Sequence, residues 1–105
     1  SFLKTEKPAA RIRRNSQSTL AADDELLLTC SVNEAAVNIT WKKDGGLIRE
    51  SATIHSQLDE TTSRLIIAKV VKDDSGNYSC EARNRLGDVA RSTVMIIVGR
   101  KLLLM

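Results

Sequence analysis

The stretch Asp74-Ser75-Gly76-Asn77-Tyr78-Ser79-Cys80 predicts a tight turn followed by a β-strand. Side chains alternate between the two faces of a strand, so Tyr78, Cys80 and Ala82 share one face. The alternate residues Asn77, Ser79, Glu81 and Arg83 share the other face. A tyrosine that closely follows an Asp-x-Gly turn can return its hydroxyl to the backbone of that turn. We therefore expect the face of Tyr78 and Cys80 to lie in the core.

The chain contains two cysteines, Cys30 and Cys80, which lie far apart in the sequence. This separation excludes a Cys-x-x-Cys metal or redox site and favours one long-range disulfide, with two buried free thiols as the alternative. On the chain-entropy model, closing a loop of this length stabilises the fold by about 4 kcal/mol. A disulfide indicates an oxidising compartment.

Alternating apolar residues predict further strands on both sides of the opening stretch. The residues expected to point inward are Leu26, Leu28, Cys30 and Val32 in residues 26–32, Val37, Ile39 and Trp41 in residues 37–42, and Leu65 and Ile67 before the corner at Val70. Leu27 is expected on the outer face. Turns are predicted at Asp23-Asp24, Asp44-Gly45-Gly46 and Asn84-Arg85-Leu86-Gly87.

The two ends of this pattern are less regular. Residues 11–14 predict an edge strand with Ile12 inward, and residues 15–22 a crossing segment. Short strands are expected at Leu47-Ile48 and Thr53-Ile54-His55-Ser56, with a turn over residues 59–62. Residues 89–98 form the last strand, but Val94 to Val98 are apolar at both parities, so periodicity leaves the register open. One of its faces is expected to carry excess exposed apolar area.

Length and composition fit one globular domain. The chain has 105 residues, 42% of them hydrophobic, and a net charge of +3. We expect a domain over residues 8–98, with residues 1–7 as a linker or tail and residues 99–105 as a linker to a next segment of a longer protein. The apolar end at residues 102–105 is too short to span a bilayer, so any membrane association would come through the parent protein. Because 13 acidic residues are interspersed with the basic ones, the charge does not predict nucleic-acid binding.

Together these residues resemble an immunoglobulin domain of the intermediate type, the I-set. The matching pieces are Cys30, Trp41-Lys42-Lys43-Asp44-Gly45, Leu65-Ile66-Ile67, Asp74-x-Gly76-x-Tyr78-x-Cys80 and Asn84-x-x-Gly87. The resemblance covers residues 8–98. It implies an all-β, immunoglobulin-like β-sandwich of two antiparallel sheets with about seven or eight strands in a Greek key and one inter-sheet disulfide. One departure is Asp23, where the family often has glycine.

The resemblance also assigns structural roles. Cys30 and Cys80 would bond across the sheets, with Trp41 packed on the disulfide. Tyr78 would form a tyrosine corner with the turn at Asp74 and Gly76, and Leu65 would complete the core signature. Asp74 is expected to hydrogen-bond locally or to pair with a basic side chain such as Arg64.

Two candidate modification sites are N-glycosylation sequons, Asn38-Ile39-Thr40 and Asn77-Tyr78-Ser79. Both asparagines have outward parity, because Ile39 and Tyr78 point inward. A chance occurrence is the alternative for such short motifs. Two outward sequons in a domain with a disulfide favour a secreted context.

Six basic residues are the candidates for a ligand patch: Arg11, Arg13, Arg14, Lys42, Lys43 and Arg49. If they converged, they would bind heparan sulfate with a strong dependence on salt; a solvated basic face is the alternative. Residues 11–14 also match an Arg-x-Arg-Arg processing pattern, but a folded edge strand is a poor protease substrate.

No catalytic or metal site is expected, and no cofactor. His55 is the single histidine, without ligand-spaced cysteines or carboxylates. Asp73, Asp74 and Ser75 indicate a structural turn. Once both cysteines are bonded, no Ser/His/Asp or Cys/His set is available. We therefore expect a non-enzyme.

Three functions remain open at this point. The first is a protein–protein interaction or cell-adhesion module, with protein partners that include a second copy of itself, in an extracellular or cell-surface receptor or adhesion glycoprotein. The second is an intracellular structural domain of a titin-like muscle filament protein. The third is a heparan-sulfate-binding domain of a secreted growth-factor precursor.

Overall fold

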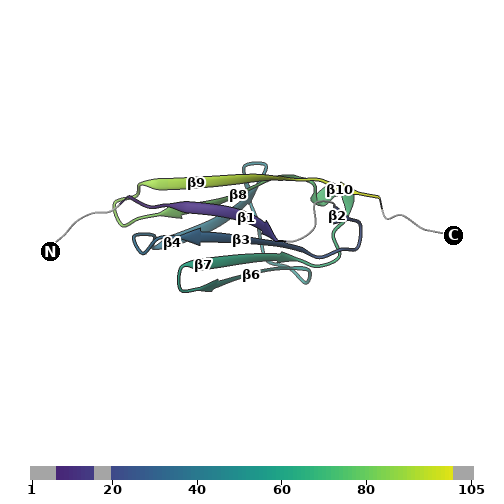
Figure 1. Cartoon of the computed structure of the whole chain (residues 1–105), viewed down its shortest axis with the longest axis horizontal. Coiled ribbons are helices and arrows are strands. Elements are labelled where there is room, and N and C mark those ends of the chain that lie inside the picture. The colour runs from purple at the N-terminus through teal and green to yellow at the C-terminus, as the bar shows by residue number, and fades with distance from the viewer. Residues whose placement is uncertain (1–6, 16–19, 101–105) are drawn as a thin grey trace.

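The computed structural model describes residues 7–15 and 20–100, in which nearly all regular structure is β-strand (Figure 1). One antiparallel sheet has the order β1-β3-β7-β6 and a second has the order β5-β4-β8-β9. The first consists of β1 (Ala10–Asn15), β3 (Leu26–Val32), β6 (Ile54–Asp59) and β7 (Thr62–Ile67); the second of β4 (Asn38–Lys43), β5 (Gly46–Leu47), β8 (Gly76–Arg83) and β9 (Val89–Ile96). A 3-10 helix, η1 (Lys72–Asp74), precedes β8, and β2 (Leu20–Ala21) pairs in parallel with β10 (Val98–Gly99).

This arrangement confirms the predicted all-β sandwich. Strand β3 pairs with β7, whereas its sequence neighbour β4 lies in the other sheet and pairs with β8. Such crossing between sheets is the Greek-key connectivity of these sandwiches. Within the described ranges, no helix has the length and apolar composition needed to cross a membrane.

The core lies between the sheets and follows strand alternation. Leu28 and Cys30 on β3 and Cys80 on β8 are fully buried, as is Val70 at the corner after β7. The predicted disulfide between Cys30 and Cys80 is present and joins β3 of one sheet to β8 of the other. It connects the two layers through the centre of the core.

Trp41 occupies the core next to this bond and is 6% exposed. Its indole Nε1 donates a hydrogen bond of 2.9 Å to Oγ of Ser63 on β7. Ser63 is 4% exposed and lies opposite Cys30 in the sheet register. This polar pair crosses between the sheets, and it satisfies the one polar atom of a buried indole.

Several turns contain residues with positive φ, among them the turns at Asp44-Gly45 and at Asp23. Asp44 and Gly45, with φ of 50° and 85°, form the two-residue connection between β4 and β5, in the pattern of a type I′ hairpin. Asp23 has φ of 75°, so it adopts the backbone region that glycine favours and that aspartate tolerates. The Asp23 amide donates to the Val70 carbonyl at 2.8 Å. The departure from glycine at this position therefore leaves the turn intact.

The inward prediction for Val37 is wrong, because this side chain is 53% exposed. Strand β4 begins one residue later, at Asn38. Val37 follows the loop of residues 33–36 and lines an open depression at the surface, together with Val32 of β3 and Leu58 of β6. Leu27 does take the outer face, and it is half-buried.

The last strand is divided in two. Ile96 and Val98 are buried, whereas Met95 and Ile97 are 53% and 69% exposed, so the even-numbered residues face the core. Pairing with β8 ends at Ile96, and after Ile97 the chain pairs with β2 instead. The predicted excess of exposed apolar area is confirmed at Met95 and Ile97.

Part of the predicted crossing segment contributes to the core. Leu20 on β2 is 6% exposed and packs within the core cluster. Residues 16–19 of that segment lie outside the described residues, as do most of the two predicted linkers, including residues 102–105.

Candidate interaction surface

The outer face of the β5-β4-β8-β9 sheet is the first candidate surface. Because Trp41 and Cys80 point into the core, the adjacent Lys42 and Glu81 point outward. The register places Glu81 between Thr40 on β4 and Arg91 on β9. We call this surface the glutamate face; its side chains come from Asn38, Thr40, Lys42, Asn77, Ser79, Glu81, Arg83, Arg91, Thr93 and Met95.

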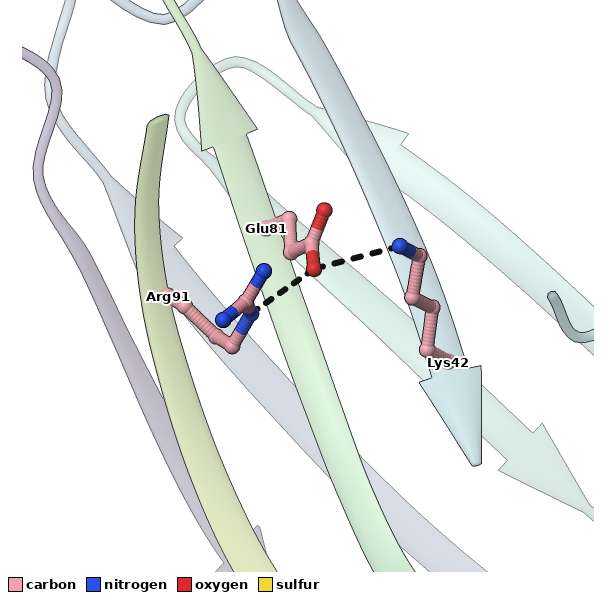
Figure 2. A network of polar contacts seen from close by, with 3 residues as sticks. All are labelled: Lys42, Glu81 and Arg91. Atoms are coloured by element: carbon pink, nitrogen blue, oxygen red, sulfur yellow. Dashed lines mark hydrogen bonds and ion pairs between the residues drawn. The ribbon is translucent and has the colours of Figure 1, made fainter. Parts of the chain in front are cut away.

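Glu81 lies at the centre of this face and joins three strands. Figure 2 shows Arg91 of β9 and Lys42 of β4 approaching it from opposite sides. The Arg91 Nε donates to Glu81 Oε2 at 2.7 Å, and Lys42 Nζ lies 3.3 Å from the same oxygen. Although the residue faces outward, it is only 7% exposed, because the two long basic side chains cover it.

The two cations keep the carboxyl group of Glu81 ionised. The hydrogen bond from Arg91 lowers the pKa of Glu81 most, the contact with Lys42 lowers it further, and burial opposes both effects. An ionised Glu81 is thus part of the folded state at neutral pH. Its negative charge also compensates the positive charge of Lys42, so Lys42 is not free to attract an anionic ligand.

Around this network the surface forms a depression of about 650 Å³. Its lining is polar or charged and comes from β4, β8, β9 and the Asp44-Gly45 turn. Chemically, this depression offers hydrogen-bonding groups and charge to a partner surface.

Both predicted glycosylation asparagines lie on the glutamate face and are exposed. Asn38 is the first residue of β4 and lies opposite Arg83. Asn77 lies near the start of β8 opposite Met95, and its backbone N–H donates to the Asp44 carboxylate at 2.9 Å. The two asparagines therefore flank the Glu81 network at opposite ends of the same face.

Two residues of the predicted core signature, Asp74 and Tyr78, meet at the corner where η1 leads into β8. The Tyr78 hydroxyl donates to the Asp74 carbonyl at 2.5 Å, and the Asp74 carboxylate accepts the Val71 amide at 2.8 Å. Asp74 thus bonds locally, as one of the two predicted options. Burial, with smaller contributions from nearby aspartates, raises the pKa of Tyr78. This tyrosine is therefore a structural hydrogen-bond donor.

Gly76 and Leu65 serve the same framework. Gly76 has φ of 156°, and a Cβ there would lie 2.7 Å from an oxygen of the Asp44 carboxylate. Only glycine leaves room for the contact that Asp44 makes with the Asn77 amide. Leu65 on β7 is 1% exposed, in the core.

The structure separates the six predicted basic residues into two groups. Arg11, Arg13 and Arg14 lie on β1 in the first sheet. In the second sheet, Lys42 is paired with Glu81, Lys43 Nζ donates to the Asp73 carbonyl, and Arg49 is exposed after β5. The fold does not gather these six residues into one patch.

The histidine that was considered as a metal ligand lies apart from the aspartates that were considered as catalytic acids and bases. His55 is exposed on β6, while Asp73 and Asp74 belong to η1 in the other part of the domain. Among the described residues, no cluster of three His, Cys, Asp or Glu side chains could hold a metal ion.

Sequence reasoning missed the roles of Glu81, Arg91 and Ser63. The sequence correctly predicted that Glu81 faces outward. It did not predict that Glu81 is buried, because the burial depends on which residues the strand register places beside it. Arg91 lies directly opposite it, whereas Lys42 reaches it diagonally, because the direct partner of Lys42 is Ser79. A carboxylate on a central strand with basic residues on both neighbouring strands is the signal that could have identified the network.

Comparisons with known proteins agree with this architecture. The family model of the immunoglobulin domain matches residues 16–93. The solved structure of the titin domains Z1Z2 in complex with telethonin has a TM-score of 0.77 at 21% identity, over 94% of this chain and 51% of that chain. At this identity the similarity shows the fold alone.

Sequence relatives come from two kinds of protein. A titin homolog of Caenorhabditis elegans is 38% identical over 82 residues, which is 76% of this chain and, in whole per cent, 0% of that protein. A vascular endothelial growth factor receptor kdr-like protein of Danio rerio is 39% identical over 85 residues, 81% of this chain and 6% of that protein. The chain spans 10% or less of the curated relatives first found, so it corresponds to a small part of each.

Proposed function

Because the chain belongs to the immunoglobulin domain family, we propose that it is a non-catalytic protein-recognition module of an extracellular receptor or adhesion protein. One observation carries the extracellular part of this proposal. The domain combines an inter-sheet disulfide with two exposed sequon asparagines, Asn38 and Asn77. A disulfide persists in oxidising compartments, and N-glycans are added only to chains that enter the secretory route. The similarity to a receptor of Danio rerio supports the same assignment.

We also propose that the domain is of the intermediate, I-set type. A variable-type domain adds two strands to the sheet that contains β4, β8 and β9. Here the described chain between β4 and β6 supplies only β5, with two residues. The segment between the cysteines is therefore too short for the variable-type arrangement.

The competing function is an intracellular structural module of a muscle filament protein. Its support is the similarity to a titin homolog, at nearly the same identity as that to the receptor. This function would need mechanical stability and would use neither glycan. The two proposals therefore predict different covalent states of the same domain.

The test is the intact mass of the domain from a eukaryotic secretory host, measured with and without glycosidase and reductant. We expect a mass deficit of two protons that reductant reverses, and glycan mass that disappears in Asn38→Gln and Asn77→Gln variants. Free thiols and an unglycosylated chain after passage through that host would contradict the extracellular assignment. Forced unfolding of the same protein would then test the filament function.

Heparan sulfate and a second copy of the chain remain the other proposed partners. The separation of the six basic residues weakens the heparan sulfate proposal. Salt-dependent retention on a heparin column would support it, and loss of retention already at low salt would remove it. Sedimentation of the domain at increasing concentration tests self-association.

A further inference from the structure

The outer face of the other sheet, β1-β3-β7-β6, has a different character from the glutamate face. Strand alternation and register place its side chains in three rows that run across the strands. The rows are Leu27, Ile66 and His55; Arg13, Thr29, Arg64 and Gln57; and Arg11, Ser31, Thr62 and Asp59. We call this surface the arginine face. It carries neither sequon.

Three guanidinium groups on this face have no partner among the residues that the structure describes. Arg11 and Arg13 are exposed on β1, and Arg64 is half-buried on β7. Within residues 7–15 and 20–100, none of these three side chains makes a hydrogen bond or an ion pair. Lys42 and Arg91 on the opposite face, by contrast, share the carboxylate of Glu81. The arginine face therefore presents three guanidinium groups that no carboxylate of the described residues compensates.

The spacing of these groups matches an extended chain of acidic residues. Arg11 and Arg13 are two residues apart on one strand, which is about 7 Å, and Arg64 lies two strands from Arg13, which is about 10 Å. The carboxylate of these rows, Asp59, lies on the edge strand β6, three strands or about 14 Å from Arg11. Alternate residues of an extended peptide are also about 7 Å apart, and arginine binds carboxylates in bidentate fashion.

An apolar pair adjoins the arginines. Leu27 and Ile66 lie directly opposite each other in the register, and both are half-buried on the outer face. A sulfated polysaccharide has no apolar side chain to cover this pair, whereas a polypeptide does. Hydroxyl groups of Thr29, Ser31 and Thr62 between the charges add hydrogen-bonding capacity.

We propose that the arginine face is the recognition surface of this domain and that it binds an acidic polypeptide segment with apolar residues. The inference deepens the proposed function, on which it rests, by assigning the protein partner a surface and a charge. Glycans on Asn38 and Asn77 would cover the opposite face and leave the arginine face open. Buried apolar contact with Leu27 and Ile66 supplies affinity, and the arginines supply orientation and association rate.

The test uses the whole chain and a fluorescent dodecapeptide of alternating glutamate and leucine, followed by anisotropy at low and physiological salt. We expect binding that weakens with salt and that falls at least tenfold in the variant Arg13→Gln/Arg64→Gln. The matched control Arg49→Gln/Arg85→Gln removes the same charge from exposed positions elsewhere and should bind like the original protein. Circular dichroism confirms that both variants fold.

A second variant distinguishes an acidic polypeptide from a sulfated polysaccharide as the negatively charged partner. Leu27→Thr should weaken binding of the peptide and leave binding of a heparin fragment unchanged. Equal binding by the arginine variant and its control would overturn the assignment of the face, and heparin binding without peptide binding would overturn the assignment of the partner. Either result leaves the intact-mass experiment untouched, so failure here is distinct from failure of the extracellular proposal.

Discussion

The hydrogen bond between Trp41 and Ser63 offers the sharpest test of how this core is held together. Both residues are almost entirely buried, at 6% and 4% exposure, and their polar atoms are 2.9 Å apart. In Ser63→Ala the indole N–H loses its acceptor at a place that water does not reach. Leaving a buried donor unsatisfied costs about 1–3 kcal/mol, and we expect a loss of about 2 kcal/mol in the free energy of unfolding. For a domain of this size that corresponds to a decrease in Tm of roughly 8–16 °C.

The assay is urea unfolding with the disulfide intact. Trp41 is the single tryptophan of the chain, so its fluorescence reports directly on the core. The midpoint should move to lower urea while the slope of free energy against urea concentration stays constant. Ser31→Ala is the matched control, because Ser31 lies exposed on β3 and its loss should change stability by less than about 0.5 kcal/mol.

A double-mutant cycle then isolates the hydrogen bond from the loss of the hydroxyl itself. In a Trp41→Phe background no indole donor remains, so Ser63→Ala should cost clearly less than in the original protein. Circular dichroism replaces fluorescence in this background. The reasoning is refuted if Ser63→Ala lies within about 0.5 kcal/mol of the original protein, or if it costs as much with phenylalanine as with tryptophan.

Three further predictions concern the corner and the glutamate face. Tyr78→Phe removes the donor to the Asp74 carbonyl and should lower the free energy of unfolding by about 1–2 kcal/mol in urea titration, and an unchanged midpoint would contradict this role. Gly76→Ala should lower the free energy of unfolding by more than about 1 kcal/mol, because the new Cβ would lie 2.7 Å from the Asp44 carboxylate. Adding Asp44→Gly to this variant should restore part of the lost stability. For Glu81, the lowered pKa means that the ionised form stabilises the folded state above about pH 4.5 and that this contribution is lost as pH falls through the folded-state pKa. The difference in free energy of unfolding between the original protein and Glu81→Gln should therefore become smaller as the pH falls from about 6 to about 3. A difference that stays constant over this range would show that the charge of Glu81 does not contribute to stability.

Much of the fold was predictable because its strongest signals are local. Alternation of apolar residues identified the inward face of residues 26–32, which is buried except for the partly buried Val32, and the inward positions of Leu65 and Ile67, which are both buried. The Asp-x-Gly-x-Tyr-x-Cys pattern located the corner, where the Tyr78 hydroxyl meets the Asp74 carbonyl. These features depend on backbone preference and on the period of two, which the amino-acid order carries by itself.

Where local signals ended, the predictions failed or stayed open. Val37 continued an alternating pattern beyond the end of its strand, which begins at Asn38, and parity alone does not report where a strand ends. Leu20 lay in a stretch without periodicity, and it became a core residue because β2 pairs with β10 from the far end of the chain. The register of the apolar run from Val94 to Val98 comes from pairing with two different strands: with β8 as far as Ile96, and with β2 at Val98.

The amino-acid sequence by itself determined that this chain forms a two-layered β-sandwich, with Cys30 and Cys80 in its core and two outward sequons. Only the tertiary structure decided which side chains share a surface. It enclosed Glu81 between Lys42 and Arg91, and it placed Arg13 and Arg64 on the opposite face, where no side chain of the described residues pairs with them. The physical reason is that the alternation of side chains along a strand, which is visible in a short stretch of sequence, decides which face a residue occupies. Its neighbours on that face come from other strands, and the register that brings them together depends on pairing between distant parts of the chain.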